Sequence, residues 1–321
     1  MKRIGILTSG GDAPGMNACI RAVVRAGIQK GFEVYGIYSG FEGMIEGSIS
    51  QLTTQSVSNI IQRGGTILKT SRSERFKTEE GMQAAYEQLK KLEIDAVIAI
   101  GGDGTFKGAT IFSQEYKIPF IGIPGTIDND LFGTEFTIGY DTAINTAVEL
   151  IDKVRDTANS LGRLFFIEVM GRDVGTIALV SGLASGAEDI LIPEIKTDLK
   201  EISEKLKNSR QKESYIIVVA EGDDAGGVVE IAAKFRKMHP EYDIKTLVLG
   251  HLQRGGNPSA NDRILASRLG VAAIDAIIDK NLNVVVGIHN NKVLHTPLNL
   301  AVKHFLTINE EWKELMYLLS Y

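Results

Sequence analysis

Three apolar runs that each end in a loop rich in glycine and aspartate constrain the fold of this chain more than any other feature. The runs cover residues 2–8, 95–101 and 118–123, and each reads as a buried strand. In open α/β sheets, ligands bind outside the carboxyl ends of the strands. We therefore expect the three loops to converge along one edge of a parallel sheet and to form a binding site there.

The third loop, residues 124–130, sets two carboxylates two positions apart. If the segment stays extended, Asp128 and Asp130 point to the same side and Asn129 faces away. Acid/base chemistry can use such a pair, because one carboxylate accepts a proton while the other tunes its charge or helps to hold a cation. The alternative is a polar turn in which these residues cap the next helix.

The second loop, residues 102–108, suits a polyphosphate. Gly102 and Gly104 let the backbone approach a bulky anion, and the following helix offers unpaired N–H groups and a positive dipole end. Asp103 cannot itself attract phosphate, so we expect it to hold a divalent cation, with helix capping as the alternative. The glycine spacing matches neither the usual dinucleotide fingerprint nor a Walker loop.

The first loop, residues 9–17, contains the glycine pair Gly10 and Gly11 and leads into an amphipathic helix that Gly31 ends. The pair lets a substrate approach the main chain, although a tight strand-to-helix turn would explain it equally well.

Length, charge and cysteine content exclude several classes of protein. A chain of 321 residues with 44% hydrophobic content is expected to form two lobes, with a boundary near residue 138. A net charge of −5 gives no basic surface for nucleic acid. The one cysteine, Cys19, excludes an intramolecular disulfide and reads as a buried hydrophobe. With no secretory signal and no membrane span, we expect a soluble, cytoplasmic protein without nucleic-acid or membrane partners.

Strand and helix patterns alternate with short connections, which predicts a doubly wound α/β fold. Further strands are expected near residues 33–38, 163–169, 189–192, 214–220, 244–249 and 284–289. Helices are expected near residues 17–30, 79–92, 141–159, 174–186, 198–208, 226–237 and 259–280.

The second half of the chain carries charge suited to an anionic substrate. Arg163 precedes one predicted strand and Arg172 follows it, and the planar fork of arginine suits phosphate, although either residue could simply be solvated. Glu221 ends another strand, where it could accept sugar hydroxyl protons or cap a turn. His251 and Arg254 lie among glycines in a loop suited to phosphate, while a structural role is the alternative for a lone histidine.

Five motifs in order, SGGDAPGMN, IGGDGT, PGTIDND, EVMGR and GHLQRGG, resemble those of bacterial ATP-dependent 6-phosphofructokinases. The resemblance implies a glycolytic kinase that uses Mg²⁺ and transfers the γ-phosphoryl group of ATP to the 1-hydroxyl of fructose 6-phosphate. It also implies a cytoplasmic homotetramer with shared sugar sites. Each chain would form two Rossmann-like, doubly wound lobes with mainly parallel sheets and the active site in the cleft between them. The lobes would be residues 1–138 with 252–303 for ATP, and 139–251 with 304–321 for the sugar phosphate.

The resemblance also assigns residues to roles. The ATP site would comprise Gly11, Arg72, Ser73, Gly102, Asp103, Gly104, Thr105 and Gly108, with Asp103 as the magnesium ligand. Asp128 would be the base, and the other catalytic residues would be Thr126, Asp130, Arg72, Arg172 and Gly11. The sugar phosphate would meet Thr126, Ile127, Asp128, Met170, Gly171, Arg172, Glu221, His251, Leu252, Gln253 and Arg254, with Arg163 and Lys245 from the adjoining subunit. An ADP or phosphoenolpyruvate effector would meet Arg21, Arg25, Arg155, Gly186, Glu188, Arg210 and Lys212.

Several positions depart from the pattern of the enterobacterial relatives. Thr54, followed by Gln55, stands where an arginine is found, and Glu213 stands where a lysine is usual. Each lost charge-assisted contact is worth about 1.5–3 kcal/mol, so we expect blunted ADP activation and phosphoenolpyruvate inhibition. Lys245 replaces a frequent arginine and gives up the bidentate fork, while Ser73 and Lys77 change the adenine-side loop.

Two glycines bear on the phosphoryl donor. Relatives that use pyrophosphate typically carry Asp at the position of Gly104 and Lys at that of Gly125, so this chain is expected to use ATP. NAD kinases and lipid kinases also carry the GGDGT element and are alternatives that change the acceptor. A non-catalytic nucleotide sensor is the alternative of a different class.

Overall fold

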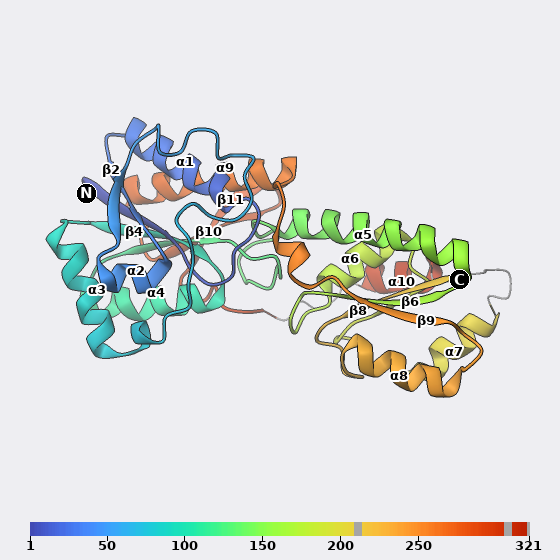
Figure 1. Ribbon diagram of the computed structural model, residues 1–321. Coiled ribbons are helices and arrows are strands. Elements are labelled where there is room, and N and C mark those ends of the chain that lie inside the picture. Colours follow the sequence, from blue (N-terminus) through green and yellow to red (C-terminus); the bar gives the residue numbers. More distant parts are fainter. Residues whose placement is uncertain (209–213, 305–309, 320–321) are drawn as a thin grey trace. The chain divides into compact units, whose positions relative to one another are not determined.

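The computed structural model describes residues 1–208, 214–304 and 310–319 and divides into two compact units (Figure 1). Unit 1 comprises Met1–Thr142 and Arg254–His304, and unit 2 comprises Ala143–Gln253 and Phe305–Tyr321. Each unit is a mainly parallel sheet with helices on both faces. The predicted fold class, two doubly wound α/β lobes, is thereby confirmed.

Unit 1 is built on a seven-stranded sheet. In spatial order its strands are β11 (Lys292–Pro297), β10 (Val284–His289), β5 (Phe120–Pro124), β4 (Ala96–Gly101), β1 (Arg3–Thr8), β2 (Glu33–Ile37) and β3 (Ile49–Leu52). The five central strands are parallel, and the edge strands β11 and β3 are antiparallel to their neighbours. The central strands β1, β4 and β5 are almost wholly buried, as expected for parallel strands covered on both faces.

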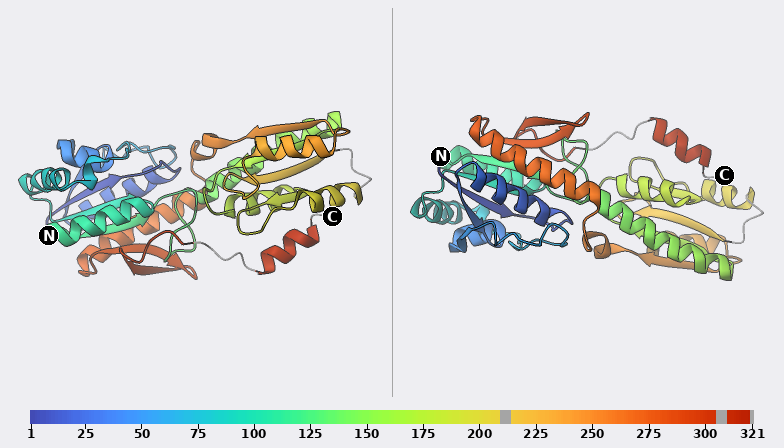
Figure 2. Two further views of the ribbon diagram at one scale, coloured as in Figure 1. Left: turned by 90° about the horizontal axis from the view of Figure 1, so that it is seen from below. Right: turned by 90° about the horizontal axis from the view of Figure 1, so that it is seen from above.

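Helices cover both faces of this sheet (Figures 1 and 2). One face carries α1 (Met16–Gln29) and α9 (Ala260–Ile278), and the other carries α2 (Gly40–Glu46), α3 (Glu79–Lys91) and α4 (Asp103–Tyr116), with the short 3₁₀ helix Arg75–Lys77 beside them. The core beneath α2, α3 and α4 is rich in aromatic rings. Phe112 contacts Phe76 and Phe120, with ring centroids 5.5 and 5.8 Å away, respectively. Burial of such rings is a large apolar contribution to stability.

The strand order places the loops of unit 1. From β1 the chain continues to β2 and β3 on one side, and it then returns to β4 and β5 on the other side. The order therefore reverses between β1 and β4, and a crevice outside the carboxyl ends of the strands at such a point is where open α/β sheets bind ligands.

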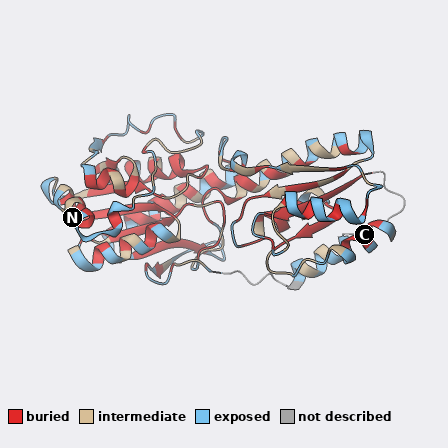
Figure 3. Ribbon diagram, turned by 60° about the horizontal axis from the view of Figure 1, so that its bottom comes forward, coloured by how far each residue is buried: buried red, intermediate tan, exposed pale blue. Residues whose placement is uncertain are grey.

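Unit 2 contains a four-stranded, wholly parallel sheet. In spatial order its strands are β7 (Asp189–Leu191), β8 (Tyr215–Ala220), β6 (Leu164–Val169) and β9 (Ile244–Val248). One face packs on α7 (Leu199–Asn208) and α8 (Val228–Met238), and the other face carries α5 (Tyr140–Leu161), α6 (Thr176–Ser185) and α10 (Glu310–Leu319). In both units the central strands are buried, and the helices expose their outer faces (Figure 3).

Two strands and one helix of unit 1 were not expected from the sequence. Strands β3 and β11 are edge strands in which half or more of the residues are exposed, so they carry little apolar periodicity. Helix α2 has only seven residues and contains two glycines, which weakens its helical pattern. Among the described residues, no helix combines the length and apolar character needed to cross a lipid bilayer.

Candidate active site

The three loops singled out in the sequence lie side by side in unit 1. They follow β1, β4 and β5, which are adjacent in the sheet. The N–H of Ser9 in the first loop donates to the carbonyl of Ile100 at 3.0 Å, and the hydroxyl of Thr105 in the second loop donates to the carbonyl of Ser9 at 3.2 Å. The N–H of Gly125 in the third loop donates to the carbonyl of Gly101 at 2.9 Å. The loops thus form one hydrogen-bonded rim.

The glycines of the second loop leave the start of α4 open. A Cβ on Gly104 would have no atom within 4 Å, and one on Gly102 would meet only the Cβ of Thr126, at 3.9 Å. Neither glycine has a positive φ. Packing and backbone conformation therefore require neither glycine. Gly104 is exposed in the first turn of α4 and leaves space for an anion beside the start of the helix.

Asp103 is the first residue of α4, but its carboxylate does not cap the helix. The N-cap is Gly102, which has no side chain to offer. One oxygen of Asp103 accepts the N–H of Lys303 at 3.0 Å, and the other lies 2.7 Å from the ammonium of Lys107. The side chain keeps 24% of its surface exposed, so a ligand can still reach it.

Asp128 and Asp130 are both buried, at 3% and 5% exposure. The expectation of an extended segment through them is wrong. Strand β5 ends at Pro124, and Asn129 lies in the left-handed region with φ 51°. The chain therefore turns between the two aspartates, and the strand rule does not apply to them.

Lys303 links the second and third loops. Its N–H donates to Asp103, and its ammonium lies 3.9 Å from a carboxylate oxygen of Asp130. The next N–H, that of His304, donates to the carbonyl of Asp130 at 2.7 Å. Two carboxylates from different loops thus lie within the span of one lysine. No sequence motif marked Lys303, which is brought here by tertiary structure alone.

Gly11 leaves room for a guanidinium group. A Cβ at this position would lie 2.7 Å from an Nη of Arg254. The structure therefore brings Gly11, expected at the ATP site, beside Arg254, expected at the sugar phosphate.

A segment after β3 folds over the first loop. The side-chain amide of Asn17 donates to the carbonyls of Arg63 and Gly64 at 3.1 and 3.0 Å, and its oxygen accepts the N–H of Ile67 at 2.7 Å. The hydroxyl of Thr70 donates to the carbonyl of Gly10 at 2.8 Å. Asn17 was foreseen only as a helix start, because its partners lie about 50 residues away.

Arg72 follows this segment and is exposed. Among the described residues it forms no hydrogen bond or ion pair, so its guanidinium is available to an anion. Ser73 instead serves the fold, since its oxygen accepts the N–H of Phe76 at 3.1 Å and its hydroxyl donates to Glu42. Gly108 also has a packing role, because a Cβ there would lie 3.3 Å from the ring of Phe41.

In unit 2, the loops after β6 and β8 are joined by Glu221. Its carboxylate accepts the N–H of Arg172 at 2.7 Å, and its own N–H donates to the carbonyl of Val169 at 3.0 Å. Gly171 and Arg172 have φ of 143° and 55°, so the chain turns sharply here. The side chains of Arg172 and Glu221 belong to exposed residues, whereas Met170 is buried.

Arg163 and Lys245 meet on one carboxylate, that of Asp243. Arg163 Nε lies 2.8 Å and Lys245 Nζ lies 2.7 Å from its two oxygens. Hydrogen bonds from Lys245 and then Arg163 hold the pKa of Asp243 below its ordinary value. Asp243 was not foreseen, because only the neighbouring strands β6 and β9 bring the three residues together.

His251 and Leu252 are exposed on the 3₁₀ helix Gly250–Arg254, whereas Gln253 is fully buried. The amide of Gln253 donates to the carbonyl of Gly250 at 3.2 Å, which gives Gln253 a role in the turn itself.

Comparison with known proteins agrees with this arrangement of loops. The sequence model of the family described as phosphofructokinase matches residues 3–277. The chain belongs to the phosphofructokinase family. It is 55% identical over 306 residues to ATP-dependent 6-phosphofructokinase 2 of Bacteroides thetaiotaomicron, which covers 95% of this chain and 94% of that one. It is 53% identical over 322 residues to ATP-dependent 6-phosphofructokinase 1 of Thermus thermophilus, with 100% of each chain covered. The resemblance expected from the five motifs is confirmed.

Solved phosphofructokinases share the fold. That of Saccharomyces cerevisiae matches with a TM-score of 0.89 at 34% identity, over 100% of this chain and 48% of the yeast chain, so this chain spans about half the length of the yeast protein. A pyrophosphate-dependent phosphofructokinase of Marinobacter aquaeolei matches with a TM-score of 0.87 at 22% identity and shows the fold alone.

The residues expected at a phosphofructokinase effector site are distributed over both units. Arg21 and Arg25 lie on α1 of unit 1. In unit 2, the guanidinium of Arg155 contacts Glu188 at 3.3 Å and donates to the carbonyls of Ser185 and Gly186 at 3.0 and 2.8 Å. Arg210 and Lys212, with Glu213, lie outside the described residues.

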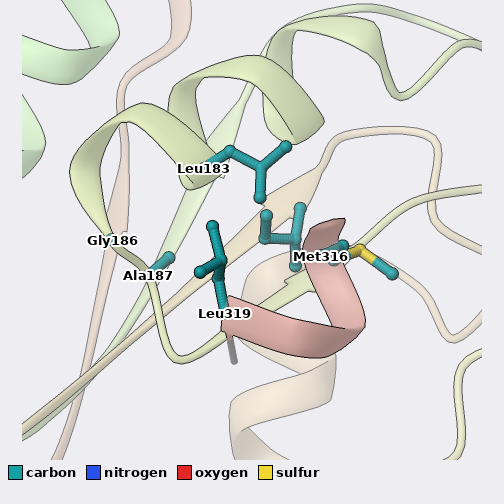
Figure 4. Close-up of a pocket in the computed structure, with 6 residues that line it drawn as sticks. Leu183, Gly186, Ala187, Met316 and Leu319 are labelled. Carbon is teal, nitrogen blue, oxygen red and sulfur yellow. The ribbon is translucent and has the colours of Figure 1, made fainter. Parts of the chain in front are cut away.

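Gly186 also lines a cavity of about 210 Å³ (Figure 4). The other lining residues are apolar and come from α6, the turn before β7, β7 and α10: Leu183, Ala187, Ile190, Met316 and Leu319. Apolar side chains of this kind offer no hydrogen-bond partner to a phosphate group. On its polar side, Gly186 offers its carbonyl to the guanidinium of Arg155.

Proposed function

We propose that this chain transfers the γ-phosphoryl group of ATP to the 1-hydroxyl of D-fructose 6-phosphate, giving fructose 1,6-bisphosphate and ADP in glycolysis. The observation that carries the proposal is the rim of unit 1, where an open helix start suited to phosphate adjoins a loop with two buried aspartates. The bacterial relatives that match nearly the whole chain are ATP-dependent 6-phosphofructokinases by name.

Asp128 is the base in this proposal. It accepts the proton of the sugar hydroxyl as the hydroxyl oxygen attacks the γ-phosphorus, and ADP leaves with the electrons of the broken P–O bond. Thr126 supports the loop, because its hydroxyl oxygen accepts the N–H of Asp128 at 3.2 Å. Asp130 lies 3.9 Å from the ammonium of Lys303, which links this loop to the segment that also contacts Asp103.

Asp103 would hold Mg²⁺. The described residues contain no group of three side chains able to bind a metal ion. Mg²⁺ in kinases usually takes one or two carboxylates and completes its shell with water and substrate phosphates, so a partly exposed carboxylate beside the phosphate loop fits it. When bound, the ion neutralises charge on the phosphates.

Arginines supply further positive charge. Phosphoryl transfer has a loose transition state, so it needs aligned reactants and charge compensation more than covalent help. Arg72 in unit 1 and Arg172 in unit 2 are both exposed, and we assign them to the transferred group.

The sugar phosphate would be bound by residues of unit 2 together with Arg254, which begins the second stretch of unit 1. The residues of unit 2 are Met170, Gly171, Arg172, Glu221, His251, Leu252 and Gln253. Arg163 and Lys245, already gathered on Asp243, would reach the site of an adjoining subunit in a cytoplasmic homotetramer. The two cations outnumber the one carboxylate, so the cluster keeps a net positive charge that suits a phosphate.

The donor is ATP rather than pyrophosphate in this proposal. The open space around Gly104 leaves room for the nucleotide's α-phosphate. At Gly125, a Cβ would lie 2.8 Å from Ile100, so the lysine typical of pyrophosphate users does not fit without a shift.

We also propose that ADP and phosphoenolpyruvate change the saturation by fructose 6-phosphate only weakly. Thr54 and Gln55 are exposed and uncharged, and the guanidinium of Arg155 already serves the carbonyls that end α6. Strong shifts of fructose 6-phosphate saturation by low millimolar ADP or phosphoenolpyruvate would contradict it.

A coupled assay of fructose 1,6-bisphosphate formation tests the main proposal. We expect turnover with ATP, Mg²⁺ and fructose 6-phosphate, and little with pyrophosphate in place of ATP. A higher kcat/KM for pyrophosphate would overturn the donor, and turnover only with another acceptor would overturn the substrate.

A further inference from the structure

Asn129 combines a rare backbone conformation with two side-chain hydrogen bonds. Its φ of 51° lies in the left-handed region, which non-glycine residues seldom adopt and which asparagine tolerates better than most. Its amide nitrogen donates to the carbonyl of Glu135 at 3.0 Å, and its amide oxygen accepts the N–H of Thr137 at 2.8 Å. Because a carbonyl only accepts and an N–H only donates, these partners fix the orientation of the amide.

These bonds close the loop that contains the two aspartates. The hydroxyl of Thr137 donates to the carbonyl of Thr126 at 2.6 Å, and the N–H of Ile138 donates to the carbonyl of Pro124 at 2.9 Å. The loop is thus tied at its base by backbone and Thr137, and in its interior by Asn129. Asp128 and Asp130 lie directly on either side of the residue that makes the interior tie.

We propose that Asn129 is a positioning residue for phosphoryl transfer, because its amide holds Asp128 in the geometry that proton removal requires. The proposal rests on the function proposed above, in which Asp128 is the base. The left-handed turn sets the direction of the chain between the aspartates, and the amide locks that turn to residues 135–137.

The rate of proton removal depends on the hydrogen bonds of Asn129, because the rate is sensitive to the distance between the carboxylate of Asp128 and the sugar hydroxyl. A displacement of about 1 Å can cost about 10²-fold in rate. The second loop, which is proposed to bind ATP, is held by separate hydrogen bonds through Ser9 and Thr105. A loosened Asp128 should therefore lower turnover without lowering affinity for ATP.

The test is Asn129→Gly. Glycine adopts a positive φ without strain, so this change removes the amide and retains the turn. We expect kcat for fructose 6-phosphate to fall about 10²-fold, with the Kd and the binding stoichiometry of ATP, measured by calorimetry, unchanged.

Asn283→Gly is a matched control. Asn283 also has a left-handed backbone, with φ 58°, and its amide oxygen accepts the N–H of Phe120 at 3.0 Å, where β5 begins. Asn283→Gly also removes the amide of a left-handed asparagine, but at the opposite end of β5 from the aspartates. It should therefore lower the melting temperature and leave kcat within about twofold.

Three outcomes decide the matter. A selective fall of kcat in Asn129→Gly supports the proposal. A kcat that stays near the wild-type value overturns the proposal. A kcat that falls only in proportion to the binding stoichiometry of ATP also overturns it, because Asn129 would then only stabilise the fold. A wild-type enzyme that does not turn over ATP and fructose 6-phosphate overturns the proposed function itself, and this inference with it.

Discussion

Asp128 is 3% exposed, and its N–H is held by Thr126. If it is the base, Asp128→Asn removes the proton acceptor and retains the size of the side chain. We expect kcat to fall about 10²- to 10⁴-fold, the range that general base catalysis supplies, with ATP affinity retained. Single-turnover kinetics and calorimetric titration with ATP measure the two quantities. Unchanged turnover would favour a nucleotide sensor instead.

Gly104 tests the choice of phosphoryl donor at a single residue. Because a Cβ there meets no atom within 4 Å, we expect Gly104→Asp to melt near the wild-type temperature. The new carboxylate would repel the α-phosphate, so kcat/KM for ATP should fall by at least about tenfold, which corresponds to about 1.4 kcal/mol. Gly125→Ala is the contrasting change, since its methyl would lie 2.8 Å from Ile100 and should lower the melting temperature. An unimpaired use of ATP by Gly104→Asp would contradict the donor argument.

For single residues, the sequence predicted the functional role of those that lie within motifs. It could not predict the role of residues that only the tertiary structure brings to the site. Asp103 and Asp128 were marked by neighbouring glycines and by their place after apolar strands. Lys303, Asp243 and Asn129 were not, because their roles depend on partners that the fold supplies or, for Asn129, on a backbone conformation that the extended interpretation missed.

At the scale of elements, Asp262 joins the beginnings of α9 and α5. It lies in the first turn of α9 and is 1% exposed. Its two oxygens accept the N–H groups of Gly139 and Thr142, each at 2.8 Å. Asp262→Ala would leave both donors buried without an acceptor, at a cost of about 1–3 kcal/mol each. Urea unfolding measures the loss. Ser259→Ala removes the N-cap of α9 and the hydrogen bond from the Ser259 hydroxyl to Asp141, and loss of the cap alone should cost about 1 kcal/mol.

The same carboxylate should give a pH signature. Burial raises the pKa of Asp262 above its ordinary value of 3.8, while hydrogen bonds from Thr142 and Gly139 oppose the shift. A raised folded pKa means that the folded state binds the proton more tightly than the unfolded state, so this group's contribution to stability falls as pH rises from 3.8 through the folded pKa. The free energy of unfolding of wild type minus that of Asp262→Asn should therefore decrease across this window. An increase would contradict the assigned direction.

Predicted elements agree with the structure where apolar periodicity is strong. Strands β1, β4 and β8 and helix α3 begin and end within about two residues of their predicted limits. The two strands that were not predicted, β3 and β11, lie at the two edges of the sheet of unit 1. Side chains there meet water on at least one face, which weakens the apolar pattern.

At the scale of the whole molecule, the reactivity of Cys19 can be used to measure whether unit 1 is folded. It is fully buried in α1 against α9, and burial raises the pKa of its thiol. Since the thiolate is the reactive form, the native protein should react with Ellman's reagent far more slowly than the urea-unfolded protein, as followed by absorbance. The rate should track the opening of unit 1, and fast labelling of the native protein would contradict the burial.

Unit 1 is assembled from two separate stretches of chain, and this has a consequence for biosynthesis. Strand β5 gains its neighbour β10 only after all of residues 143–253 have been made. During translation, the whole sheet of unit 2 can therefore form on the ribosome while β5 still has an open edge, which can template mispairing. A nascent chain halted shortly after residue 253 should be the species with the greatest need of a chaperone.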